Sequence, residues 1–96
     1  MENIKQYLIK EATSETIAKE REIQDSEQEL AVLGARLKLE NKILGMQDLQ
    51  ERLKEDFKYS AQALESMLAQ EQHKNTELKK ELEMLKYRKA VLESQF

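Results

Sequence analysis

The residues of this chain whose types could do chemistry are its single histidine, His73, and the acidic residues near it. A catalytic site needs a nucleophile with a base, a paired acid and base, or a cluster of metal ligands. Glu71 and His73 are two residues apart, which places them on different faces of a helix, and no glutamate stands three residues before the histidine. The chain has no cysteine and no glycine-rich phosphate loop. We therefore expect no enzyme, no metal site and no cofactor, with His73 as a solvated residue.

The composition indicates long helices as the elements that carry these residues. Of the 96 residues, 36% are charged, and the chain has no proline, cysteine or tryptophan. A lone helix of this length cannot bury its own apolar stripe, so either the chain folds back or partner chains cover it. We expect an all-α protein, a long and largely continuous helix that forms a coiled coil or a multi-helix bundle with partner chains.

The apolar pattern divides the chain into two parts. Residues 1–14 read as a short amphipathic helix with a frayed joint near Thr13 and Ser14, and residues 15–96 read as a long coiled-coil helix. Ser26 and Glu29 have the spacing of a capping box, but the helix formers on both sides favour continuation.

Two apolar stripes overlap in the middle of the chain. Together they make a face wider than the seam of a two-stranded coil, which predicts a bundle-like core over residues 30–57. The first stripe is Ile23, Leu30, Leu33, Leu37 and Leu44, and the second is Val32, Leu39, Ile43, Met46 and Leu53.

A regular heptad repeat follows a stutter at Leu53, Phe57 and Ala61, which are four residues apart in turn. Glu71, at a d position, is the weak point of this seam. Over the predicted zipper of residues 75–96, charged pairs at g and e favour two parallel copies. The register has Phe57, Leu64, Leu78, Leu85 and Leu92 at d, and Ala61, Leu68, Asn75, Leu82, Lys89 and Phe96 at a; the attractive pairs are Glu81 with Lys86 and Arg88 with Glu93.

From these stripes we predict an oligomer interface and a second, smaller partner surface near the end of the chain. The interface consists of Leu30, Leu33, Leu37, Leu39, Ile43, Leu44, Met46, Leu53, Phe57, Leu64, Leu68, Asn75, Leu78, Leu82, Leu85 and Leu92. The smaller surface consists of Met84, Tyr87, Val91 and Phe96.

The two glycines, Gly34 and Gly45, decide between a rod and a hairpin. They are eleven residues apart, and the stretch between them contains helix formers and no turn signal beyond Asn41. Each glycine costs about 1 kcal/mol relative to alanine, which long flanking helices can absorb. The sequence favours a helix that continues through both glycines, and a helical hairpin remains the alternative.

The predicted function is that of a non-enzymatic assembly or scaffold subunit that oligomerises and holds partners in register. The alternatives are a tethering or adaptor helix that enters a partner's bundle, or a helical hairpin. Residues 1–29 hold eight acidic and four basic residues, which disfavours nucleic acid and anionic membrane as partners of that end. The polar N-terminus and the lack of a long apolar run predict an intracellular protein, cytoplasmic or nuclear. We expect its partners to be copies of itself or other coiled-coil subunits.

Overall fold

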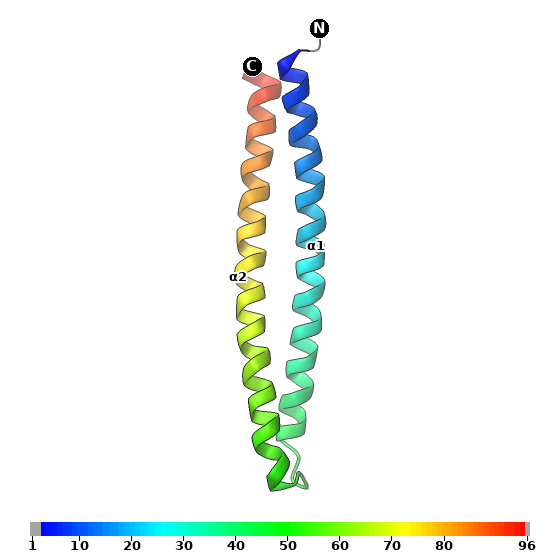
Figure 1. Ribbon diagram of the computed structural model, residues 1–96, viewed down its shortest axis with the longest axis vertical. Coiled ribbons are helices and arrows are strands. Elements are labelled where there is room, and N and C mark those ends of the chain that lie inside the picture. The colour runs from blue at the N-terminus through cyan, green and yellow to red at the C-terminus, as the bar shows by residue number, and fades with distance from the viewer. Residues whose placement is uncertain (1–2, 96) are drawn as a thin grey trace. The chain divides into compact units, whose positions relative to one another are not determined.

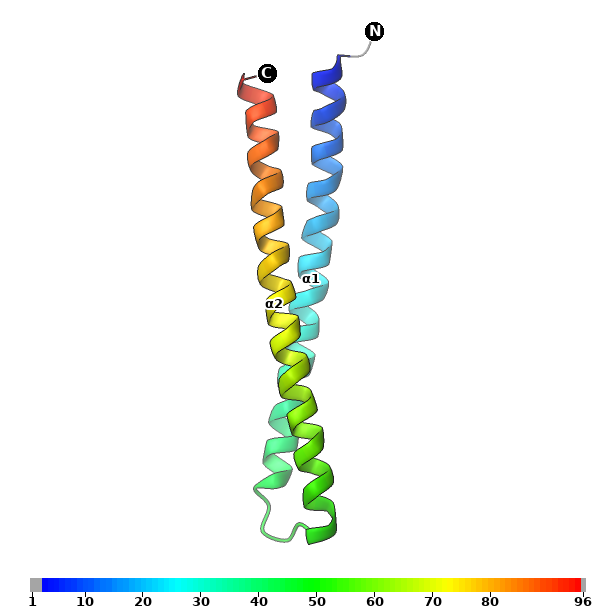
Figure 2. The ribbon, with the colours of Figure 1, turned by 60° about the vertical axis from the view of Figure 1, so that its left-hand side comes forward.

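The computed structural model describes residues 3–95, which form two long α-helices (Figure 1). Helix α1 spans Ile4–Leu44, helix α2 spans Glu51–Gln95, and residues 45–50 connect them. The chain divides into two compact units. We call Ser26–Lys74 the loop unit, and Met1–Asp25 with Asn75–Phe96 the terminal unit. Within each unit a segment of α1 packs beside a segment of α2 that runs in the opposite direction (Figures 1 and 2). The all-α class is confirmed, in the form of a helical hairpin.

Asn3 caps the start of α1. Its side-chain Oδ1 accepts a hydrogen bond from the backbone N–H of Lys5 at 3.0 Å, and its carbonyl accepts one from the N–H of Tyr7 at 3.1 Å. Asparagine is among the best residues at this position because its short side chain satisfies an N–H group that has no partner within the helix.

Helix α1 continues through the predicted joint near Thr13 and Ser14. The hydroxyl of Thr13 donates to the carbonyl of Ile9 at 2.8 Å, four residues earlier in the chain. This back-bond satisfies the hydroxyl inside the helix, so that no cap or break is needed there. The helix also continues through Ser26, as expected.

The prediction of an unbroken helix over residues 15–96 is wrong at residues 45–50. The helix does continue through Gly34, but α1 ends at Leu44, where the N–H of Gly45 still bonds to the carbonyl of Asn41 at 3.1 Å. No described glycine has a positive φ, so the turn does not depend on a left-handed residue. The chain turns because a lone helix would leave its apolar stripe exposed to water. Folding back lets each helix bury the apolar stripe of the other within one chain.

The seam of the loop unit combines apolar and polar layers. Leu33, Ala61 and Leu64 are buried, and Leu33 is only 1% exposed. The buried hydroxyl of Ser26 donates to the carboxylate of Glu71 at 2.6 Å, so the predicted weak point of the α2 seam is paired with a polar residue of α1.

A second polar pair lies between Ser60 and Glu40 in the same unit. The Ser60 hydroxyl donates to Oε1 of Glu40 at 3.0 Å, and Oε2 of Glu40 is buried with no hydrogen-bond partner. Because such polar layers are satisfied only by the correct opposite residue, they favour one register of the two helices.

The seam of the terminal unit uses the predicted register of α2. Leu78 and Leu85 at d and Asn75 at a are buried, with Ala12 and Ile23 contributed by α1. The burial of these three residues agrees with the predicted register, but the helix that covers them is α1 of the same chain. The predicted parallel pairing of two zippers would require this antiparallel seam to open.

Candidate interaction surfaces

His73 is exposed, and within residues 3–95 no group of three or more histidine, cysteine, aspartate or glutamate side chains is placed to hold a metal ion. Two surfaces formed by segments of α1 and α2 are candidate interaction sites.

Most of the predicted interface residues lie in the seam between α1 and α2. Only the members of the second apolar stripe are displaced from this seam, and three of them are clearly exposed. The buried residues are Leu33, Leu64, Asn75, Leu78 and Leu85; the half-buried ones are Leu30, Leu37, Ile43, Leu44, Phe57, Leu68, Leu82 and Leu92; the exposed ones are Leu39, Met46 and Leu53.

The buried and half-buried residues of α1 set its heptad register, with Ile23, Leu30, Leu37 and Leu44 at a and Ala12, Lys19, Ser26, Leu33 and Glu40 at d. The heptad positions next to this seam define two sides of each unit. In an antiparallel pair, g positions border g positions and e positions border e positions. A groove in the loop unit shows this arrangement, because Glu29, Met67 and Lys74, all at g, line it together. One side of each unit is therefore built from positions c and g, and the other side from positions b and e.

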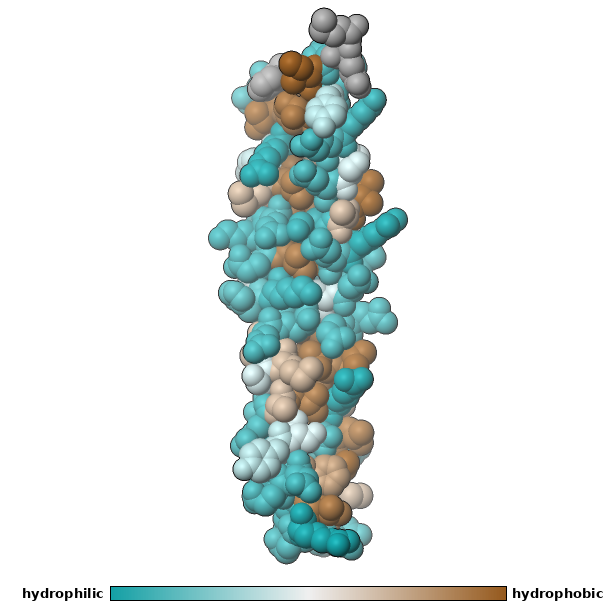
Figure 3. Space-filling view, viewed as in Figure 1, coloured by the Kyte–Doolittle hydropathy of each residue, from teal (hydrophilic) through white to brown (hydrophobic). Residues whose placement is uncertain are grey.

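In the loop unit, the side built from c and g carries the second apolar stripe. We call its five large apolar residues the apolar face: Val32, Leu39 and Ile43 on α1, and Leu53 and Met67 on α2. Leu39 is 59% exposed and Met67 is 46% exposed. In the space-filling view, the part of the surface near the connecting loop shows brown and tan side chains along α1 (Figure 3). At the b and e positions of this unit, alanine is the largest apolar residue.

In the terminal unit, the predicted smaller partner surface is largely uncovered. Met84, Tyr87 and Val91 are 49%, 72% and 43% exposed. Phe96, the fourth predicted member, lies outside the described residues. Met84 and Val91 occupy c positions, so they lie on the side of the unit built from c and g.

A groove of about 360 Å³ lies beside Met84 on this side of the terminal unit. We call it the acidic groove. Ala18, Met84 and Leu85 supply its apolar lining, and Glu15, Glu22, Glu81, Lys19 and Arg88 supply its charged lining.

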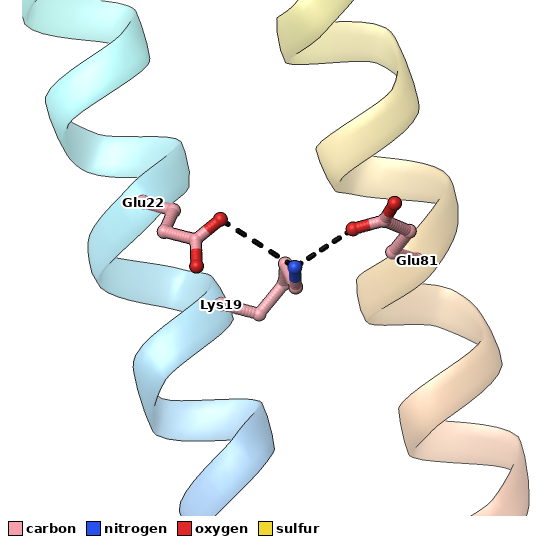
Figure 4. Close-up of polar contacts among 3 residues, drawn as sticks. All are labelled: Lys19, Glu22 and Glu81. Atoms are coloured by element: carbon pink, nitrogen blue, oxygen red, sulfur yellow. Dashed lines mark hydrogen bonds and ion pairs between the residues drawn. The ribbon is translucent and has the colours of Figure 1, made fainter.

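Lys19 connects the two helices within this groove. It occupies a seam position, but its side chain reaches outward and places Nζ 2.7 Å from Glu81 and 3.4 Å from Glu22 (Figure 4). The hydrogen bond to Glu81 raises the pKa of Lys19 above its ordinary value of 10.5, and partial desolvation opposes this effect. The amine therefore stays protonated and neutralises part of the charge of two carboxylates.

The sequence pattern did not reveal the acidic groove, although it identified Met84. Glu15 and Glu22 are seven residues apart on α1, and Glu81 lies on α2; these three carboxylates come to one groove only when the chain folds back. A hairpin prediction would have brought their g positions to one side.

The described residues contain no helix that is long and apolar enough to cross a membrane. Comparison of the chain with protein-family models, with curated proteins and with solved structures finds no match in any of the three.

Proposed function

We propose that this protein is an assembly subunit, a helical hairpin that self-associates through the apolar face of its loop unit and thereby helps to hold partners in register. The single observation that carries the proposal is the exposure of large apolar side chains on one side of a hairpin whose seam is already filled. Leu39 is 59% exposed and Leu53 is 37% exposed, although both belong to a regular stripe. A contiguous apolar strip that the chain leaves open is typical of a surface that another helix covers.

The charges around the apolar face suit a second copy of the same chain. The c and g positions of the loop unit contain two acidic residues, Glu29 and Asp56, and two basic residues, Arg36 and Lys74. Because these charges balance, two copies can bring this side together without net repulsion. Two hairpins joined in this way would form a four-helix assembly, which would cover the wide face over residues 30–57.

Sedimentation velocity over a wide range of concentration tests the proposal. We expect the chain, whose mass is 11.3 kDa, to sediment as a multiple of that mass and to dissociate on dilution. Leu39→Lys should shift the association to higher concentration by about 100-fold or more, since it would bury an unpaired charge.

Ala31→Lys is the matched control. It adds the same charge to an exposed position of α1 in the same unit, but on the side built from b and e. It should leave self-association within about 3-fold of the parent, as expected of a surface change away from the contact. A parent chain that stays monomeric at all concentrations, or equal effects of the two variants, would contradict the proposal.

A further inference from the structure

We infer that the acidic groove of the terminal unit is a docking site for a basic amphipathic α-helix of a different protein. This site lies in the other unit from the apolar face and has a different occupant, so it does not depend on self-association of the loop unit.

The groove combines an apolar floor with an acidic rim. Ala18, Met84 and Leu85 form the floor, and Met84 is 49% exposed to solvent. Glu15 and Glu22 border it from α1 and Glu81 borders it from α2. The occupant of such a groove must present apolar side chains to the floor. A helix with one apolar stripe can do so by lying along the groove between α1 and α2.

The charge of the groove's side determines the sign of that occupant. In residues 3–25 and 75–95, the c and g positions hold six acidic residues and one basic residue, Arg88. The b and e positions of the same segments hold three acidic and three basic residues. The excess negative charge is therefore confined to one side of the unit, the side that also has the exposed apolar residues.

The two cations that line the groove, Lys19 and Arg88, do not remove this excess, because six acidic residues lie on the same side of the unit. Lys19 lies between Glu22 and Glu81, so its single charge is shared by two carboxylates. Glu15 keeps its carboxylate exposed at the rim, and Glu11 and Asp25 are exposed at c positions nearby. Lysine or arginine side chains flanking the apolar stripe of an incoming helix would meet these carboxylates.

The same charge excludes other occupants of the groove. A second copy would bring two acidic sides together, which costs free energy because like charges then face each other. Nucleic acid and anionic lipid surfaces are repelled for the same reason. The occupant that fits both the floor and the rim is a helix with a leucine-rich stripe and basic flanks.

Binding of synthetic peptides to the full chain tests this inference. Three peptides of equal length are needed: one with leucine at a and d and lysine at e and g, one with glutamate in place of each lysine, and one with the composition of the first but no stripe. Repulsion between their e and g residues keeps the first two from pairing with themselves. Fluorescence anisotropy of the labelled peptides gives the dissociation constants. The basic striped peptide should bind at least about 10-fold more tightly than either of the others, and the binding should weaken as salt is raised.

Substitutions then locate the binding site. Glu15→Lys should weaken binding of the basic peptide by about 3- to 10-fold, whereas Glu20→Lys, the same charge change on the side built from b and e, should change it by less than about 2-fold. Met84→Ser should weaken binding, and Ile17→Ser, an exposed apolar control on the side built from b and e, should not. Circular dichroism checks that each variant keeps the parent's helix content.

Two results would overturn the inference: equal binding of the three peptides, or equal losses from Glu15→Lys and Glu20→Lys, which would mean attraction by net charge alone. Leu39→Lys should leave peptide binding unchanged, so a failure of self-association and a failure of the groove give different results.

Discussion

Substitution of Leu33 by alanine should be the most damaging single apolar truncation in the loop unit. Leu33 is 1% exposed in the seam, so nearly all of its side chain is removed from water. Burial of a whole leucine side chain contributes about 1.5–3 kcal/mol, and the space left by truncation adds to the loss. We expect Leu33→Ala to lower the free energy of unfolding by about 2–3 kcal/mol, because a seam of only two helices can partly close around the vacated space.

Leu39→Ala is the control for this substitution. It changes the same residue type in the same helix, so the effect on helix propensity is equal, but Leu39 is 59% exposed. Its truncation should lower the free energy of unfolding by less than about 1 kcal/mol in the monomer.

Urea unfolding followed by circular dichroism, at a concentration below self-association, measures both effects. With a slope of about 1–3 kcal/mol per molar urea, a loss of about 2–3 kcal/mol in Leu33→Ala should lower the midpoint by about 0.7–3 M. Equal midpoints for the two variants would refute the assignment of Leu33 to the seam and of Leu39 to the open face.

Two further predictions concern the glycines and Lys19. Gly34→Ala should raise the free energy of unfolding by up to about 1 kcal/mol, since a Cβ there would meet no atom within 4 Å; a loss of stability on thermal melting would mean that Gly34 is in close contact. Gly45→Ala should change it less, because the added Cβ would lie 3.5 Å from the Lys42 carbonyl in ordinary contact and the residue lies where the helix ends. Since the hydrogen bond to Glu81 raises the pKa of Lys19 above 10.5, its contribution to stability should be constant below that pH and be lost as the pH rises through the folded-state pKa. The melting temperature of the parent should therefore fall relative to that of Lys19→Met above pH 10.5, and a relative rise there would contradict the ion pair.

The stripes of both helices could be predicted because apolar residues at alternating spacings of three and four need no knowledge of the partner. Leu33 and Leu78, which belong to these stripes, are buried as the pattern predicts. Lys19, Ser26 and Glu40 could not be assigned to the seam in this way, because polar residues at seam positions do not show in an apolar pattern. Their positions become apparent only when Glu81, Glu71 and Ser60 are placed opposite them.

The sequence favours the continuous helix over the hairpin alternative because the local signal of the turn is weak. Residues 45–50 contain one glycine and no proline, and they follow a long run of residues that favour helix. The apparent stutter at Leu53, Phe57 and Ala61 lies within α2 and not at the turn. It does not mark a change of register, because Leu53 is exposed on the apolar face while Phe57 and Ala61 lie in the seam at d and a.

The fold-back itself is the central claim, since it fills the seam with the chain's own residues and leaves the apolar face open. Spin labels on cysteines introduced at Ser14 and Glu83 test it most directly, because the chain has no cysteine of its own and both positions are exposed in the terminal unit. The labelled protein is diluted into an excess of unlabelled chain, so that only distances within one molecule are measured by pulsed electron resonance. The hairpin predicts a distance under about 30 Å, the width of two packed helices with their labels. A continuous helix would separate the labels by about 100 Å, and such a distance would contradict the account.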